Sequence, residues 1–297
     1  MAADPEDFEG IDVSIVPLGM PPSGCVGGFD AAAGKLTITL SSEVHVLLLG
    51  VVSGEVQANG VTCTAADSTV ATAVNTASIE VLGSPGDDTL ILDLATGAWG
   101  AKLLAAGPGV RVDLGTEADT FMLRGSGSPD HIQAGTVQGS AAFDLDGSGS
   151  ADVLLAGSPA IIVSLGPADD RFDGSGIQGS GAIQLGLAIY GDAGNDTLEG
   201  GLGGDTLFGG SGDDLFLTAA QADGPDSYHG GQGRDVMDYG ARVAPLSVSL
   251  DDVANDGEPG EQDNVASDIE IVVGGAGNDT LCRGRVDVHG CAEHDGV

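Results

Sequence analysis

A nine-residue repeat dominates the second half of the chain and constrains its fold more than any other feature. Three copies stand in unbroken phase from Gly191 to Leu217, with the sequences GDAGNDTLE, GGLGGDTLF and GGSGDDLFL. Two further copies, QADGPDSYH and GGQGRDVMD, follow after three extra residues, and another, GGAGNDTLC, runs from Gly274 to Cys282. A fixed period of this kind is typical of a solenoid, in which each repeat packs only against its neighbours.

The residues of each copy have the properties of a metal-binding turn followed by a short strand. The sixth position is aspartate in every copy, and the fourth is glycine. Calcium takes about six to eight oxygen ligands from carboxylates and backbone carbonyls, and glycine permits the backbone angles that let carbonyls converge on one point. The apolar residues at the eighth position, which we expect to point into the core, are Leu198, Leu207, Phe216, Tyr228, Met237 and Leu281.

These copies resemble the hemolysin-type calcium-binding nonapeptide repeat (the RTX repeat), whose pattern is G-G-x-G-x-D-x-U-x with U a large apolar residue. The resemblance runs from Gly191 to Cys282, with an interruption after Asp238. It implies an all-β fold, a right-handed parallel β-roll (a β-solenoid), in which the glycine-rich part of each copy holds calcium. Asp192, which replaces the second glycine, departs from the pattern, and so do Gln221 and Ala222.

The resemblance also implies which residues bind calcium. Two copies complete one coil, so turns two copies apart lie on the same edge and share an ion. Asp196 would then share an ion with Asp214, Asp205 with Asp226, and Asp214 with Asp235. The implied ligands are Asp196, Asp205, Asp214, Asp226, Asp235 and Asp279, with Gly191, Ala193, Gly200, Gly209 and Ser211 as turn residues that complete the shells. A metal-free solenoid that keeps aspartate for turn geometry is the alternative.

Worn copies of the repeat continue upstream, and we predict degenerate solenoid coils over residues 79–190. The weaker metal candidates of this region are Asp88, Asp152 and Asp170. Asp152 and Asp170 are 18 residues apart, which is one full coil, so the prediction places them on one edge. Metal-free coils are favoured here, because the glycine spacing that directs carbonyls towards an ion is largely lost.

The remaining segments are predicted to close the ends of the solenoid. Residues 1–78 lack the repeat, and the alternating runs 35–40 and 43–49 predict strands of a small antiparallel β cap over the first coil. Residues 191–297 form the calcium-binding β-roll with a C-terminal cap and an acidic insertion at 239–273. Within that insertion Asp256, Glu258, Glu261 and Asp263 suggest a further calcium loop, and a solvated acidic loop is the alternative.

The charge and the hydropathy of the chain limit the classes of partner that it is expected to bind. The chain has 45 acidic and 9 basic residues and a net charge of −36, which argues against nucleic acid and anionic membrane surfaces. The longest apolar run, residues 44–52, is too short to span a bilayer as a helix, so no membrane insertion is expected. The first residues, MAADPEDFEG, lack the basic and apolar segments of a signal peptide.

The four cysteines form two groups, Cys25 with Cys63 and Cys282 with Cys291. Four cysteines allow three pairings, which the sequence does not distinguish. We favour local disulfides within each group, with free buried thiols as the alternative. Disulfide bonds are typical of oxidising, extracytoplasmic compartments.

The chain is expected not to be an enzyme, because it lacks the GxSxG, HExxH and P-loop motifs. The resemblance implies a secreted or cell-surface protein in which several calcium ions drive folding, with a structural or adhesive role. One alternative is a calcium-dependent polysaccharide-acting enzyme of the β-helix type, for which Arg111, Arg124 and Arg171 are the candidate cations. Another is a surface-layer or other assembly subunit. The expected partners are calcium, with a surface polysaccharide or further copies of the chain as candidates.

Overall fold

The structure is a computed structural model that describes residues 19–97, 99, 109–282 and 292–295. Within these ranges the regular structure consists of β-strands. No helix long and apolar enough to cross a bilayer occurs among them.

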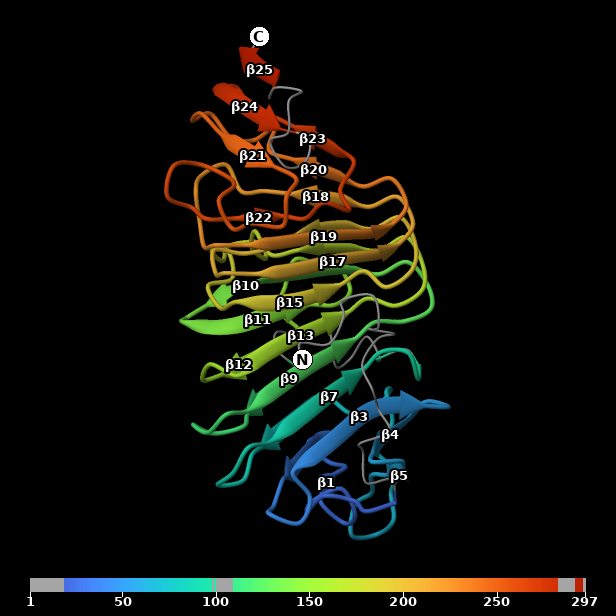
Figure 1. Ribbon diagram of the computed structural model, residues 1–297. Helices are drawn as coiled ribbons and strands as arrows, with labels where there is room; N and C mark the ends of the chain where they lie inside the picture. The colour runs from blue at the N-terminus through green and yellow to red at the C-terminus, as the bar shows by residue number, and fades with distance from the viewer. Residues whose placement is uncertain (1–18, 98, 100–108, 283–291, 296–297) are drawn as a thin grey trace.

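Two long sheets form the body of the molecule (Figure 1). Sheet 1 has 12 strands, and successive coils of the solenoid contribute strands to it. In spatial order its strands are β1 (Phe29–Asp30), β2 (Lys35–Thr39), β6 (Ser78–Leu82), β8 (Val110–Asp113), β12 (Val153–Ala156), β11 (Ser140–Asp144), β10 (His131–Val137), β14 (Arg171–Asp173), β16 (Thr197–Glu199), β18 (Leu215–Leu217), β20 (Val236–Asp238) and β23 (Ile271–Val273).

Sheet 2 has 10 strands and provides the opposite wall of the solenoid. In spatial order they are β22 (Asn264–Val265), β19 (Ser227–Gln232), β17 (Thr206–Ser211), β15 (Leu187–Tyr190), β13 (Ala160–Ser164), β9 (Thr120–Arg124), β7 (Thr89–Asp93), β3 (Val46–Val52), β4 (Glu55–Ala58) and β5 (Val61–Thr62). Sheet 3, at the C-terminal end, contains β21 (Ser247–Ser249), β24 (Asn278–Cys282) and β25 (Ala292–Asp295).

Successive strands of the repeat region alternate between sheets 1 and 2, and each pairs in parallel with the strand one coil away. The register places Leu198 beside Phe216 and Phe216 beside Met237 in sheet 1. In sheet 2 it places Leu207 beside Tyr228. Equivalent positions of the repeat therefore stack on one another, and the predicted parallel β-roll is confirmed.

The eighth residues of the repeats fill the space between the two sheets. Their side chains are buried in five copies, at Leu198, Leu207, Phe216, Tyr228 and Met237. The ring of Phe216 meets that of Tyr228 edge to face at 5.9 Å, so the two walls contact each other through these side chains. Leu281, in the last copy, is partly buried against the same core.

The N-terminal region contains antiparallel pairs, namely β1 with β2, β3 with β4, and β4 with β5. However, β2 also pairs in parallel with β6, and β3 in parallel with β7. The coils therefore begin near Lys35 rather than at residue 79. The two predicted strands lie in opposite walls of one coil and do not form a hairpin with each other.

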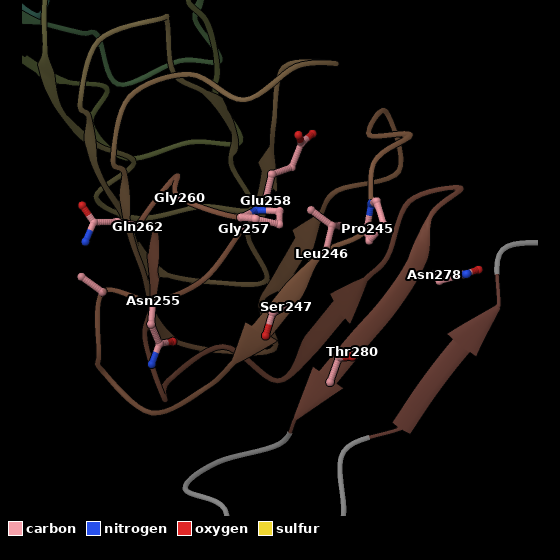
Figure 2. Close-up of a pocket in the computed structure, with 12 residues that line it drawn as sticks. Pro245, Leu246, Ser247, Asn255, Gly257, Glu258, Gly260, Gln262, Asn278 and Thr280 are labelled. Carbon is pink, nitrogen blue, oxygen red and sulfur yellow. The ribbon is translucent and has the colours of Figure 1, made fainter.

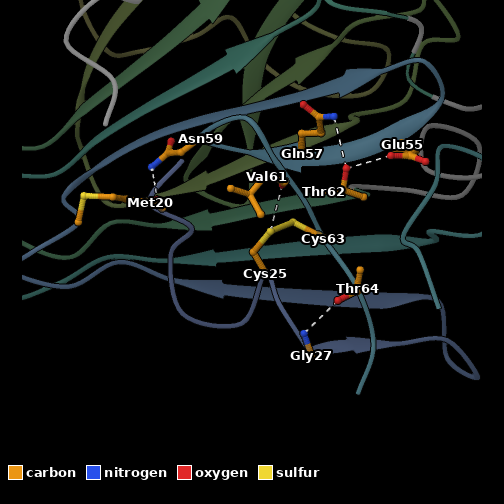
Figure 3. The surroundings of a disulfide bond; sticks show 10 residues. All are labelled: Met20, Cys25, Gly27, Glu55, Gln57, Asn59, Val61, Thr62, Cys63 and Thr64. Atoms are coloured by element: carbon orange, nitrogen blue, oxygen red, sulfur yellow. Dashed lines mark hydrogen bonds between the residues drawn. A yellow bond between two sulfur atoms is a disulfide. The ribbon is translucent and has the colours of Figure 1, made fainter. Parts of the chain in front are cut away.

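A disulfide joins Cys25 to Cys63 inside this N-terminal region, as predicted (Figure 3). Both cysteines are fully buried, and the bond links the segment before β1 to the end of the β4–β5 hairpin. Cys282 is also disulfide-bonded. Its predicted partner, Cys291, lies outside the described residues.

An antiparallel insertion, β10–β11–β12, interrupts the parallel order of sheet 1. β12 pairs in parallel with β8, whereas β10 pairs in parallel with β14, and β11 is antiparallel to both of its neighbours. The predicted pairing of Asp152 with Asp170 is therefore wrong, because two strands separate β12 from β14. Their spacing of one coil length is a coincidence.

Residues 239–273 are not a simple excursion from the roll. They supply β21 to sheet 3, β22 to sheet 2 and β23 to sheet 1. The segment thus adds to the end of the solenoid as an enlarged coil, although its sequence lacks the repeat.

Candidate calcium-binding site

A ladder of acidic residues runs along one edge of the solenoid, where each chain segment turns into a strand of sheet 1. Each backbone amide donates a hydrogen bond of 2.7–2.8 Å to a side-chain carboxylate oxygen of the next acid in the ladder. In order, the ladder contains Asp130, Asp170, Asp196, Asp214, Asp235 and Glu270; we call it the sheet 1 ladder. Asp196 and Asp214, and Asp214 and Asp235, are thus neighbours in adjacent coils, and that each pair shares an ion stays a prediction.

The second carboxylate oxygen distinguishes the central members of this ladder. Oδ2 of Asp170, Asp196, Asp214 and Asp235 is buried and accepts no hydrogen bond. A buried carboxylate oxygen without a donor is costly unless a cation neutralises it. Four such oxygens in consecutive coils have the hard, anionic character that calcium prefers. These residues therefore fit a row of calcium ions.

In the copies that contain Asp196, Asp214 and Asp235, glycine at the first position makes room for this oxygen. A Cβ atom on Gly209 would overlap Oδ2 of Asp214, and a Cβ on Gly191 would overlap Oδ2 of Asp196. A Cβ on Gly230 would lie 2.5 Å from Oδ2 of Asp235. The glycine and the aspartate of one copy are thus a single steric unit, which explains why the repeat has both.

Backbone carbonyls of the turns accept amides of neighbouring coils. The carbonyl of Ala193 accepts the amide of Ala168 at 2.7 Å, and that of Ser211 accepts the amide of Gly194 at 2.9 Å. A carbonyl oxygen has two lone pairs, so each keeps one for a cation.

Asp192 stands where the repeat has its second glycine, and it adopts the positive φ of 69° that a glycine would take. Aspartate tolerates this conformation better than most residues do. Its side chain accepts a hydrogen bond from the Ser164 hydroxyl.

Burial and mutual repulsion raise the pKa of the four central carboxyls of the ladder well above its ordinary value. The pKa of Asp196 is raised from 3.8 to about 8, chiefly by burial and then by the charges of Asp214 and Asp170. Burial likewise raises the pKa of Asp170 and of Asp214 to about 7, and that of Asp235 to about 6. Ionising the whole ladder at neutral pH therefore requires positive charge nearby.

A second ladder lies where segments turn into strands of sheet 2. The amide of Asp205 donates to Oδ1 of Asp226, and the amide of Asp226 to Oδ1 of Asp263, at 2.8 and 3.1 Å. Asp205 and Asp226 are thus neighbours in adjacent coils, that they share an ion stays a prediction, and Asp263 extends this sheet 2 ladder. Towards the N-terminus the ladder ends at Leu187, whose amide donates to Oδ1 of Asp205.

The sheet 2 ladder differs from the sheet 1 ladder in its second oxygens. Oδ2 of Asp205 accepts the amide of Gly201 at 2.6 Å. Oδ2 of Asp226 and Oδ2 of Asp263 accept the hydroxyls of Tyr228 and Tyr239, at 3.0 and 3.1 Å. Protein donors thus occupy the positions that stay free in the sheet 1 ladder, and these carboxylates also serve as turn-closing acceptors.

Two other predicted calcium ligands, Asp279 and Asp88, differ in whether protein donors reach both of their carboxylate oxygens. Asp279 accepts the amide of Leu246 through Oδ1, whereas its Oδ2 is buried without a donor, as in the sheet 1 ladder. Both oxygens of Asp88 are used within its own turn, by the amide and the hydroxyl of Ser84. Asp279 therefore fits a cation and Asp88 has the bonds of a turn residue.

The acidic insertion has an internal counterion that the sequence analysis missed. Arg242, fully buried, lies 2.7 Å from Glu261, 3.1 Å from Asp223 and 3.4 Å from Glu258. The guanidinium and backbone hydrogen bonding outweigh burial and hold the pKa of Glu261 below its usual range. The alternative of a solvated loop is wrong for these acids, and two of the four suggested calcium ligands are ion-paired instead.

The other two suggested ligands of this loop have protein donors. Asp256 accepts the amides of Ser249 and Val265, one on each oxygen, and Asp263 belongs to the sheet 2 ladder. The loop also borders a surface pocket of about 530 Å³ against β21 and β24 (Figure 2). Its lining is mixed: Pro245 and Leu246 give it apolar surface, and Ser247, Thr280 and the acid Glu258 add polar groups. It is separate from the sheet 1 ladder.

Comparison with known protein families finds the RTX calcium-binding nonapeptide repeat in 4 copies, matched to residues 190–225 and 266–281. No curated protein matches the chain. RTX repeats typically bind calcium, in agreement with the buried, donor-free carboxylate oxygens of the sheet 1 ladder. The copies at residues 190–225 and 266–281 are therefore repeats of the RTX calcium-binding nonapeptide type.

Proposed function

We propose that the chain is a secreted or cell-surface β-roll whose folding and stability depend on calcium bound along the sheet 1 ladder. The observation that carries the proposal is the row of buried oxygens without donors at Asp170, Asp196, Asp214 and Asp235. Calcium between successive turns would neutralise these carboxylates, with carbonyls such as those of Ala193 and Ser211 completing the shells. Folding and binding are then coupled, because the site exists only when adjacent coils have stacked.

An extracellular location belongs to the same proposal. Proteins with RTX repeats are typically secreted, and the buried Cys25–Cys63 disulfide favours an oxidising compartment. Extracellular calcium at millimolar concentration would keep the ladder loaded. Inside a cell, where calcium is scarce, the repulsion between the carboxylates would oppose folding.

The proposed role is structural or adhesive rather than enzymatic. Two of the three candidate cations of a polysaccharide-acting site are ion-paired, Arg124 with Asp93 and Arg171 with Asp173, and the third, Arg111, is exposed on β8. Incubation with acidic polysaccharides, followed by detection of cleaved products, tests this part. Product formation that depends on Arg124 or Arg171 would favour the enzyme alternative, and calcium-dependent sedimentation of the chain would favour an assembly subunit.

Calcium titration into chelator-treated protein tests the central claim. We expect a cooperative gain of β-structure by circular dichroism and several bound ions per chain by calorimetry. Magnesium should replace calcium poorly, because it requires compact octahedral coordination and retains its water. Elemental analysis that detected no tightly held calcium in the purified protein would refute the proposal.

A further inference from the structure

The loop between β11 and β12 brings three aspartates together outside the nonapeptide repeats. β11 ends at Asp144 and β12 begins at Val153, and the two strands are antiparallel. The amide of Asp152 donates to the carbonyl of Phe143 at 2.7 Å, so the hairpin places Asp152 opposite Asp144. Candidate ligand oxygens of Asp144, Asp146 and Asp152 all lie within 4.8 Å of one another.

One buried oxygen of this cluster has no partner. Asp152 is fully buried; its Oδ2 accepts the amide of Leu145 at 2.7 Å, whereas Oδ1 accepts no hydrogen bond. Asp144 is also fully buried; loop amides of Asp146, Gly147 and Gly149 donate to its oxygens, so the cluster's donor-free oxygen is that of Asp152. Like charges opposite each other in a hairpin are destabilising. In the described part of the chain no basic side chain forms an ion pair with any of the three aspartates. The cluster thus has an unpaired acceptor and an unbalanced charge.

The sequence of the loop, DLDGSGSAD, places side chains with oxygen atoms that can bind a cation at its positions 1, 3, 5 and 9, and glycine at position 6. Calcium loops of the EF-hand type share these positions, with a backbone carbonyl at position 7 and a glycine for the sharp turn. Gly149, at position 6, has a φ of +81°. The loop departs from that pattern at position 12, where Leu155 lies buried in β12 instead of an acid.

We propose that the loop 144–152 is a calcium site separate from the sheet 1 ladder. The carboxylates of Asp144, Asp146 and Asp152 provide its charge, and oxygen atoms of Ser148 and Ser150 add neutral ligands. An all-oxygen set on a flexible, glycine-containing loop suits calcium better than magnesium or a transition metal. Because the acid of position 12 is missing, water completes the shell.

The position of the loop gives the ion a structural consequence. The insertion joins β8, on which β12 packs, to β14, on which β10 packs, and β14 in turn pairs with β16 of the first repeat. A cation that binds both ends of the β11–β12 turn would fix this junction in sheet 1. Calcium would then stabilise the solenoid at a point that the nonapeptide repeats do not reach.

Equilibrium dialysis of the full chain against calcium, after chelator treatment, tests the site. Asp146 is exposed, so Asp146→Ala should fold and should bind one calcium ion fewer than the unchanged protein. Asp67→Ala is the matched control, because Asp67 is also exposed and also accepts an amide within its own turn. An Asp146→Ala protein with undiminished stoichiometry would overturn the proposal.

A second variant distinguishes a metal site from strain in the loop. In chelator, Asp152→Asn should melt at the same temperature as the unchanged protein or higher, since it removes a buried charge. In calcium its melting temperature should rise less than that of the unchanged protein. An undiminished rise would contradict the proposal.

The two calcium proposals can fail separately. Asp146→Ala should also remove one ion from a protein that already carries Asp214→Asn, in which the sheet 1 ladder is impaired. If Asp146→Ala removed an ion while Asp214→Asn removed none, the loop site would stand and the ladder proposal would fall. The reverse result would remove the loop site alone.

Discussion

The amide of Asp196 donates a 2.8 Å hydrogen bond to Oδ1 of Asp214, 18 residues later, while Oδ2 of Asp214 is buried without any donor. The first contact fixes the register of neighbouring coils. The second creates a need for positive charge at the same place. One side chain therefore both aligns the solenoid and makes its alignment dependent on an ion.

Replacing Asp214 by asparagine should lower stability strongly in calcium and little in chelator. Asp214 lies between Asp196 and Asp235, so its loss weakens two adjacent ion positions. At free calcium 100 times the dissociation constant, each lost ion removes about 2.7 kcal/mol of stability. In chelator the change should be neutral or mildly stabilising, because a buried charge disappears. Thermal melts under both conditions measure the difference.

Asp205→Asn is the matched control. Asp205 is equally buried and equally stacked, but its Oδ2 already accepts the Gly201 amide. We expect a smaller calcium-dependent loss at Asp205, and also at Asp279, which stacks on the Leu246 amide rather than on another acid. Equal, small losses at all three positions would contradict the model of ions stacked in the sheet 1 ladder.

Gly209→Ala should weaken calcium binding although it leaves every carboxylate in place. The added Cβ would overlap Oδ2 of Asp214 and lie 2.7 Å from the carbonyl of Gly230. Such overpacking typically costs about 1–3 kcal/mol. Calorimetry should show reduced affinity together with a lower melting temperature.

Gly127→Ala controls for the added methyl group, because nothing lies within 4 Å of its Cβ position. That variant should stay within about 0.5 kcal/mol of the unchanged protein. If both variants behaved alike, the first glycine of the repeat would serve chain flexibility rather than space for the aspartate.

The repeat itself made the coil register predictable. A strict spacing of glycine, aspartate and an apolar residue allows few other ways to bury the eighth residues, and Leu198, Phe216 and Met237 stack as expected. The spacing could not show which aspartates keep a free oxygen. That depends on donors from elsewhere in the fold, such as the Tyr239 hydroxyl that reaches Asp263.

The periodicity also could not predict which residues meet across long connections, because those contacts depend on the rest of the fold. Asp170 stacks on Asp130, 40 residues away, because the β10–β11–β12 insertion occupies the interval. Nothing in the local sequence distinguishes that spacing from the coincidental one to Asp152. Arg242 likewise lies 16 and 19 residues before Glu258 and Glu261, so only the folded chain shows that it neutralises them.

Arg242→Leu should be among the most destabilising single substitutions in the insertion. It would leave Glu261 and Asp223 buried without their counterion, and breaking a buried ion pair from one side typically costs about 3–5 kcal/mol. Urea unfolding measures the loss. Arg111→Leu, at an exposed position of β8, should change stability by less than about 0.5 kcal/mol. A similar, small effect of both changes would show that the acids of the insertion are held by other means.

The stability of the calcium-free protein should rise as the pH falls from 8 to 5. The folded-state pKa is about 8 for Asp196, about 7 for Asp214 and about 6 for Asp235, against an ordinary value of 3.8. The folded chain therefore binds more protons than the unfolded chain in this range. Stability from these groups is fully present below the unfolded value, near pH 4, and is lost as the pH rises through about 6 to 8.

Calcium should reverse this dependence, because the ions bind the deprotonated carboxylates. The gain in melting temperature on adding calcium should be largest at pH 8 and should shrink towards pH 5, where protons and calcium compete for the same oxygens. Thermal melts at pH 5, 6, 7 and 8, with calcium and with chelator, measure both curves. In chelator, Asp214→Asn should show a shallower rise on acidification, since one titrating group is gone. If the calcium-free protein became more stable from pH 5 to pH 8, the ladder carboxylates would already be neutralised within the fold, and no ion would be needed there.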